Sequence, residues 1–122
     1  MINLPIYRAF SETFDKYILG VPYFSDGRYY MLVDDCNKNN NIGSGSYPID
    51  ETTLAIHFDD MLDSQGNKIF ASLSENGKGG DIILEPYLET ERETVLSYEN
   101  YIKNINKRYH TALYSKIIGI QQ

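Results

Sequence analysis

The residues with the greatest potential for chemistry are four aspartates in the middle of the chain: Asp59, Asp60, Asp63 and Asp81. Carboxylates can hold a divalent cation, and such a cation can activate water for hydrolysis. Calcium-binding loops, however, place their ligands at fixed alternating positions and end with a Glu, and the segment around Asp63 lacks that pattern. We therefore expect a turn-rich, solvated acidic loop here. A metal-dependent hydrolase that uses these carboxylates is the alternative.

The two histidines, His57 and His110, lie far apart in the sequence. Zinc sites usually need three or four ligands at recognisable spacing, so two histidines and one cysteine do not predict one. His57 falls on the face of a predicted strand opposite to Ile56 and Phe58, because successive strand residues point to opposite sides. We expect His57 on the solvent side of that strand.

The remaining candidates are Cys36 and a short glycine-rich segment. Asp34 and Asp35 place negative charge beside Cys36, which disfavours the reactive thiolate. Gly43-Ser44-Gly45 lacks the Gly-Lys-Ser/Thr ending of a phosphate-binding loop and is too short for a Gly-x-Ser-x-Gly nucleophile turn. The sequence therefore predicts no catalytic residue, no metal ligand and no cofactor-binding residue.

The chain has 122 residues, of which 42% are hydrophobic. This length and composition predict one folded domain with its own core, residues 1–122. No apolar run is long enough to span a bilayer, and the first residues lack the pattern of a secretion signal. A single cysteine fits a reducing compartment. We therefore expect a soluble, cytoplasmic protein that does not bind membranes.

Charge is distributed unevenly along the chain. The net charge of −6 is made up of −1 in residues 1–40, −8 in residues 41–96 and +3 in residues 97–122. DNA binding relies on Lys and Arg to displace the counterions of the phosphate backbone, so the acidic middle argues against DNA as a partner. A small basic patch is typical of a solvated helix face: Lys103, Lys107 and Arg108.

The first part of the chain has the pattern of short strands separated by turns. Residues 2–10 predict a strand that Pro5 should restrict to a sheet edge, because proline cannot donate to a ladder. Residues 14–19 predict a second short strand that ends at Gly20.

A stronger signal follows at Asp26-Gly27, which predicts a tight hairpin because the primed turns require positive φ. Residues 28–33 predict the second strand of that hairpin. Residues 34–48 are rich in Asn, Gly and Ser and predict a flexible loop.

The central stretch, residues 60–84, and the segment before it predict three strands separated by turns: residues 53–58, 68–73 and 81–84. Residues 63–67 form the first turn, in which Gly66 supplies positive φ, and residues 74–80 form the second. Pro86 should stop the third strand, since it has no N–H to donate.

The C-terminal part changes period. Apolar residues recur every three or four positions in residues 97–109, which predicts a short helix capped by Ser97. Residues 111–120 predict a last strand with a bulge at Gly119. An open strand edge would template another strand, so this strand either pairs within its own chain, which we favour, or joins a neighbour's sheet in a homo-oligomer.

Together these patterns predict a mainly β domain of the β-rich α+β type. Its antiparallel hairpins form a curved sheet or a small SH3-like barrel, with one short C-terminal helix. Its parts are the N-terminal strands in residues 1–33, the flexible loop in residues 34–48, and the central hairpins with the C-terminal helix and strand in residues 49–122.

Two segments of the central stretch carry a family resemblance: residues 61–70, MLDSQGNKIF, and residues 80–83, GDII. They resemble motifs of the YopX family of phage and prophage proteins, Gly-Leu-x-Asp-Lys-Asn-Gly-x-x-Ile-aromatic followed by Gly-Asp-Ile. Residues 6–10, 49–54 and 117–120 resemble that family's outer segments. The resemblance implies a small β-rich domain with a barrel-like part, encoded by a phage or a mobile element.

The favoured functional hypothesis is a phage- or prophage-encoded accessory protein that is not an enzyme and binds a host or phage protein. It rests on the resemblance, the acidic middle and the lack of an assembled catalytic set. Eleven tyrosines suit binding surfaces, and exposed tyrosines can also stack on bases. A nucleic-acid-associated module is therefore a second alternative, beside the metal-dependent hydrolase.

Overall fold

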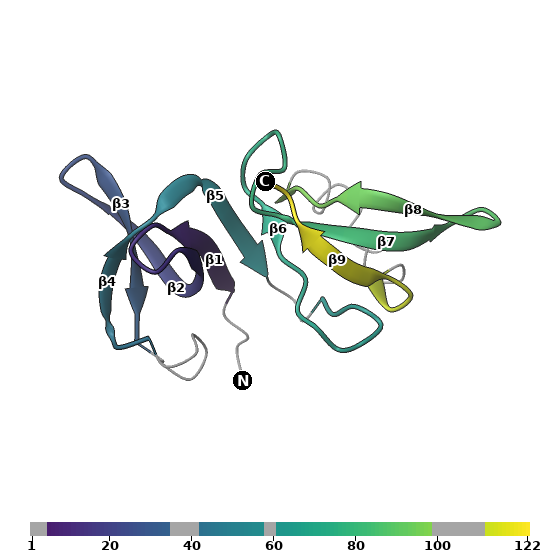
Figure 1. Ribbon diagram of the computed structural model, residues 1–122, viewed down its shortest axis with the longest axis horizontal. Coiled ribbons are helices and arrows are strands. Elements are labelled where there is room, and N and C mark those ends of the chain that lie inside the picture. Colours follow the sequence, from purple (N-terminus) through teal and green to yellow (C-terminus); the bar gives the residue numbers. More distant parts are fainter. Residues whose placement is uncertain (1–4, 35–41, 58–60, 99–111) are drawn as a thin grey trace.

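The described residues form two antiparallel sheets that lie side by side (Figure 1). The computed structural model describes residues 5–34, 42–57, 61–98 and 112–122. In chain order the strands are β1 (Ile6–Ser11), β2 (Lys16–Ser25), β3 (Arg28–Val33), β4 (Gly45–Pro48), β5 (Asp50–His57), β6 (Ala71–Ser72), β7 (Asp81–Tyr87), β8 (Thr90–Val95) and β9 (Lys116–Ile120). The first sheet has the order β4-β3-β2-β1-β5-β6, and the second has the order β8-β7-β9. The mainly β prediction is confirmed.

The six-stranded sheet is curved because the chain changes partners along it. The first half of β2 pairs with β1, and its second half, from Val21 onward, pairs with β3. Only Ile49 separates β4 from β5, yet β4 pairs with β3 while β5 pairs with β1. The chain therefore wraps round a shared interior, although the order of the described strands is that of an open sheet and not a closed barrel.

Gly20 lies at the bend of β2 and does not end it. A Cβ at Gly20 would lie 2.8 Å from Met31 Cγ and still closer to the carbonyl oxygen of Leu32. The missing side chain lets β3 approach the bend, so the prediction of a strand end at Gly20 is wrong. Glycine in a strand marks a close approach of another backbone as well as an end.

Two further predictions for the N-terminal half are wrong. β1 begins after Pro5 and lies between β2 and β5, inside the sheet, so Pro5 precedes the ladder and removes no bond from it. Within the segment expected to be a loop, residues 45–48 form β4 at the sheet edge. Polar residues suit this position because an edge strand keeps contact with water. Residues 35–41 of that segment lie outside the described residues.

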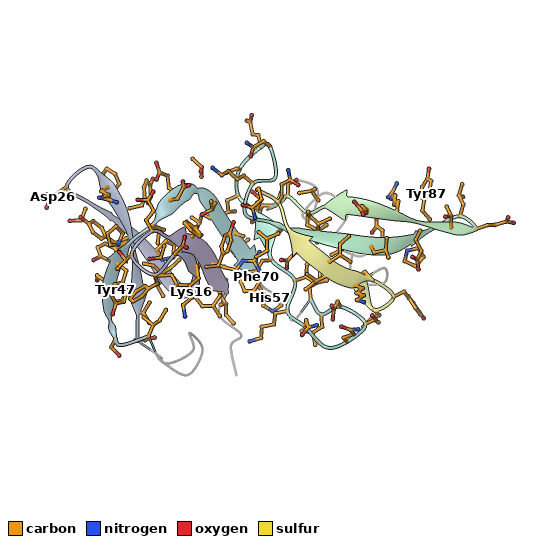
Figure 2. The ribbon with its side chains drawn as sticks, viewed as in Figure 1. Lys16, Asp26, Tyr47, His57, Phe70 and Tyr87 are labelled. Atoms are coloured by element: carbon orange, nitrogen blue, oxygen red, sulfur yellow. The ribbon has the colours of Figure 1, made fainter. Side chains whose placement is uncertain are left out.

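The β2–β3 hairpin forms as predicted. Asp26 and Gly27 have φ values of 52° and 78° and connect Ser25 to its partner Arg28. Positive φ at both central residues gives the primed turn whose twist matches that of the strands. Asp26 lies at the tip, at the end of the molecule away from the second sheet (Figure 2).

The central stretch forms less strand than predicted. Of residues 68–73, only β6 belongs to a strand, and it pairs with β5. The preceding turn is closed by an isolated bridge between Leu62 and Lys68, and Gly66 within it has φ of 80°. β6 also borders the second sheet, because the Ser72 amide donates to the Leu96 carbonyl at 2.9 Å. The segment therefore connects the two sheets.

β7 is the centre of the second sheet and continues through Pro86, contrary to the prediction. β9 pairs with β7 only from Asp81 to Leu84, so the edge of β7 that faces away from β8 is open at Pro86. A residue without an N–H costs no ladder bond at such an edge.

The last strand, β9, begins at Lys116, later than the predicted start at residue 111. It pairs within its own chain, which is the favoured version of the prediction. Ile82 lies opposite Gly119 and Ile83 lies opposite Ile117, which leaves Ile118 as an extra residue on β9. This register shift confirms the predicted bulge next to Gly119. The predicted helix, residues 97–109, lies almost entirely outside the described residues.

Each sheet has its own hydrophobic core. The first core fills the interior of the curved sheet: Ala9, Ile18, Met31, Val33, Ile42 and Ile49. The second packs beneath β7: Met61, Ile69, Ala71, Ile83, Leu96 and Ala112. Among the described residues there is no helix with the length and apolar character needed to cross a membrane.

Three glycines give a graded test of this backbone. Gly80→Ala should lower the free energy of unfolding by more than about 2 kcal/mol, because its Cβ would lie 2.8 Å from the Ser72 amide and closer to the Leu96 carbonyl. Gly66→Ala should cost about 1 kcal/mol through its positive φ alone. Gly43→Ala is the control, with its nearest atom 3.9 Å away. Measured by denaturant unfolding, the loss in free energy of unfolding should be largest for Gly80→Ala, smaller for Gly66→Ala and smallest for Gly43→Ala. Equal losses for the three variants would contradict this prediction.

Candidate functional site

The prediction that Asp63 lies in a solvated loop is wrong. Asp63 has only 3% of its surface exposed and holds the turn of residues 63–67 together. Its Oδ1 accepts hydrogen bonds from the backbone amides of Gln65 and Asn67 at 2.9 and 2.8 Å, and its Oδ2 accepts one from Ile117 at 3.3 Å. Burial raises the pKa of Asp63, but these hydrogen bonds outweigh it and hold the pKa below the ordinary value of 3.8. Asp63 is a structural carboxylate that ties β9 to the turn.

Asp81 forms a buried ion pair with Arg8 of β1. Arg8 Nη2 lies 2.9 Å from Asp81 Oδ1 and donates to the Gly79 carbonyl at 2.8 Å. Asp81 Oδ2 accepts a hydrogen bond from the Phe70 amide at 2.8 Å, and the guanidinium lies over the Phe70 ring, 4.5 Å from its centroid. Burial raises the pKa of Asp81, against the lowering effect of Arg8. The pair joins the two sheets.

His57 is buried, so the prediction of a solvent-side histidine is wrong. Its Nδ1 lies 2.9 Å from the Ile69 carbonyl oxygen, and its ring lies 5.7 Å from that of Phe70 (Figure 2). Both faces of β5 are covered, because Leu54 on one face packs on the first core while His57 on the other faces the central stretch. The alternation of apolar and polar residues identifies the solvent face of a strand only if one face is exposed, and β5 is covered on both faces.

The residues considered for metal binding are not brought together in the described part of the chain. There, no group of three or more His, Cys, Asp or Glu side chains is placed to hold a metal ion. The carboxylates of Asp63 and Asp81 are occupied by backbone amides and by Arg8. The other candidates lie outside the described residues: Cys36, Asp59, Asp60 and His110.

The Gly43-Ser44-Gly45 segment leads into a strand. Gly45 begins β4, and the Tyr47 hydroxyl donates to the Gly43 carbonyl at 2.6 Å. A phosphate-binding loop needs a helix N-terminus after its glycines, so this segment does not have that geometry.

The β2–β3 hairpin exposes hydrophobic side chains on both faces. On the outer face the rings of Tyr23 and Tyr30 stack, with centroids 5.5 Å apart and planes 21° apart. On the other face, towards the tip, Phe24 and Tyr29 meet edge to face at 5.0 Å, and Phe24 is 60% exposed. We refer to the following set as the hairpin surface: Val21, Tyr23, Phe24, Tyr29, Tyr30 and Leu32. Five of the twelve large hydrophobic side chains that are exposed among the described residues belong to it.

A cleft of about 480 Å³ lies beside the hairpin tip, between β3 and the junction of β4 and β5. It is lined by Glu12, Phe24, Gly27, Arg28, Tyr29, Ile49, Asp50 and Glu51. The Ile49 amide donates to the Tyr29 carbonyl at 3.2 Å and so holds the two walls together. Hydrogen bonds from Thr52 hold the pKa of Asp50 below its ordinary value, and the more distant Lys78 adds to this. The residues that line the cleft therefore include two with aromatic rings, three with carboxylates and one basic residue, Arg28.

Comparison with known proteins gives no match: no protein-family model, no curated protein and no solved structure is similar to this chain. The resemblance of residues 61–70 and 80–83 to the YopX family stays a prediction. The candidate site rests on the geometry of the hairpin surface and the cleft.

The sequence contains a signal for the hairpin surface. Tyr23-Phe24 and Tyr29-Tyr30 flank the Asp26-Gly27 turn at equal distance. Two successive aromatic residues in a strand point to opposite faces, so this symmetry predicts aromatic rings on both faces of the tip. The cleft has no such local signal, because Glu12 and Glu51 meet only after β1 and β5 pair.

The buried ion pair gives a stability prediction. Arg8→Met should lower the free energy of unfolding by about 3–5 kcal/mol, because it leaves Asp81 buried without a counter-charge. The double variant Arg8→Met/Asp81→Leu should be more stable than Arg8→Met alone. Lys78→Met breaks an exposed pair with Asp50 and should cost at most about 1 kcal/mol. Additive effects of the two core substitutions would show that the pair is not coupled.

Asp63 gives a prediction about pH. Its folded pKa is lowered, so its contribution to stability is present above the unfolded value of 3.8 and is lost as the pH falls through the folded pKa. Asp63→Asn should therefore cost about 1.5–3 kcal/mol at pH 7, the size of a hydrogen bond to a charged group, and less at pH 3. Urea unfolding at both pH values measures this, with Glu91→Gln on exposed β8 as the control. An equal cost at both pH values would contradict the role of the ionised carboxylate.

Proposed function

We propose that this chain is a non-enzymatic protein-interaction module that binds its partner through the hairpin surface. The single observation that carries this proposal is the two-sided aromatic hairpin tip, with Tyr23 and Tyr30 stacked on one face and Phe24 and Tyr29 packed on the other. Contiguous exposed apolar side chains on a folded domain mark an interaction site more often than scattered single ones do.

The side chains of the hairpin surface suit binding energetically. Tyr and Phe bring a large contact area and have only two side-chain torsions to fix, so they lose little entropy on binding. The ring pairs hold each other in place before a partner arrives, which reduces the cost of ordering them further. Tyrosine is among the residues that most often supply the binding energy of known interfaces, about 2 kcal/mol or more each at the centre.

The negative charge near the hairpin surface supports the view that the partner is a protein with a basic contact face. Residues 41–96 carry a net charge of −8, and three carboxylates line the cleft beside the hairpin surface. Complementary charge speeds association and excludes partners of the same sign. The same charge disfavours DNA, whose phosphates need basic residues.

The biological setting that we propose rests on the resemblance of the central stretch to the YopX family. It supports a phage- or prophage-encoded accessory protein that acts in the cytoplasm on a host or phage protein. A homo-oligomer is the alternative, in which the net charge of +3 in residues 97–122 meets the acidic middle of a second copy.

A photo-crosslinking experiment tests the proposal. A crosslinking amino acid at Phe24 in the hairpin surface should capture a partner in cells of the natural host, before or after prophage induction. The same amino acid at Leu88, which is 89% exposed at the tip of the β7–β8 hairpin, is the matched control. The crosslinked protein should disappear when Tyr23 and Tyr29 are both changed to Ser. Light scattering on the purified protein distinguishes a second copy from a different partner.

Besides a failure to capture any partner from Phe24, two results would contradict the proposal. One is capture from Leu88 but not from Phe24. The other is capture that persists in the Tyr23→Ser/Tyr29→Ser variant. The two crosslinker variants and the Tyr23→Ser/Tyr29→Ser variant should each have an unfolding midpoint close to that of the parent, because all four positions are exposed.

A further inference from the structure

We propose that the cleft beside the hairpin tip binds an arginine side chain of the partner protein. This inference rests on the proposed function and specifies the chemistry of its contact. The cleft offers the two groups that recognise a guanidinium: aromatic rings on which it can stack, and carboxylates that can accept its hydrogen bonds.

The carboxylates of the cleft differ in their availability. Asp50 Oδ1 already accepts hydrogen bonds from the Thr52 amide at 3.0 Å and the Thr52 hydroxyl at 2.6 Å, and Lys78 Nζ lies 3.6 Å from Asp50 Oδ2. Glu12 and Glu51 are exposed and take part in none of the ion pairs among the described residues. Glu12 and Glu51 are therefore the carboxylates that can accept a guanidinium, while Asp50 adds fixed negative charge.

The aromatic side of the cleft is open to a ligand. Phe24 and Tyr29 belong to its lining, and both residues are more than one-third exposed. A cation over an exposed ring gains about 0.5–1 kcal/mol, and Arg makes this contact more often than Lys. The volume of the cleft, about 480 Å³, lies in the range of pockets that hold small ligands.

The protein uses the same combination of groups twice within its own fold. Arg8 lies 4.5 Å from the Phe70 centroid and pairs with Asp81. Arg92 lies 4.3 Å from the Tyr87 centroid and pairs with Glu85 at 2.9 Å. The cleft presents the same ring-plus-carboxylate set in an open form.

Arg28 is the one basic residue in the lining. Strand alternation places it on the face of β3 that carries Tyr30 and Leu32, opposite to Tyr29. Its side chain therefore points away from the Tyr29 ring, and its positive charge opposes a second cation only at longer range. Removal of this charge should strengthen arginine binding, an effect opposite in sign to the removal of Glu12 or Glu51.

The test is an NMR titration of the intact protein with N-acetyl-arginine amide. The amide resonances of Gly27, Arg28 and Asp50 should shift and saturate at millimolar probe. Glu12→Gln/Glu51→Gln should raise the Kd by about fivefold or more, as expected for two exposed charge pairs, and Arg28→Gln should lower it. Phe24→Leu should raise the Kd about threefold through the lost cation–π contact. Glu91→Gln, on β8 of the other sheet, is the control and should change nothing.

N-acetyl-citrulline amide has the shape of the probe without its charge and should cause no saturating shifts. Three outcomes would overturn the inference: equal binding of the citrulline probe, equal or tighter binding of N-acetyl-lysine amide, or shifts spread over β8 that do not saturate. If the arginine probe fails while a crosslinker at Phe24 still captures a partner, only this inference is wrong. If the probe binds but no partner is captured, the proposed function fails and the cleft chemistry stands.

Discussion

The structure depends on one buried contact, the ion pair between Arg8 in the first sheet and Asp81 in the second. A carboxylate that is 1% exposed is stable only if its oxygens find donors, and Asp81 finds them in Arg8 and in the Phe70 amide. Asp81 and its two donors come from three separate parts of the chain. The geometry of the contact therefore fixes how β1, the segment that ends at Phe70 and β7 lie relative to one another.

Backbone contacts around this pair reinforce the same arrangement. β6 pairs with β5 on one side, and its Ser72 amide bonds to Leu96 on the other. Gly79 and Gly80 pass so close to Thr53, Ser72 and Leu96 that a side chain would not fit. The stabilising contacts thus gather at the junction of the sheets, while the hairpin surface lies at one end of the molecule (Figure 1). None of the residues of the hairpin surface takes part in these contacts at the junction.

Only part of the candidate site can be predicted from patterns in the sequence. Asp26-Gly27 predicts the hairpin, because turn geometry depends only on neighbouring residues. The aromatic pairs beside it carry a signal for two aromatic faces through strand alternation, although no site was predicted from them. The cleft could not be predicted in this way. Glu12 and Glu51 are 39 positions apart in the chain and become neighbours only because Phe10 pairs with Asp50 and the chain bends at Ile49.

The sequence by itself determined the local properties of this protein: a mainly β fold, the primed hairpin, the bulge at Gly119 and an acidic middle. Only the tertiary structure decided which faces are buried and which charges meet. His57 is buried because both faces of β5 are covered, and Asp63 is structural because the turn and β9 supply its donors. The physical reason is that φ, ψ and side-chain alternation are set by residues adjacent in the chain. Burial and ion pairing depend on partners that folding brings from distant segments.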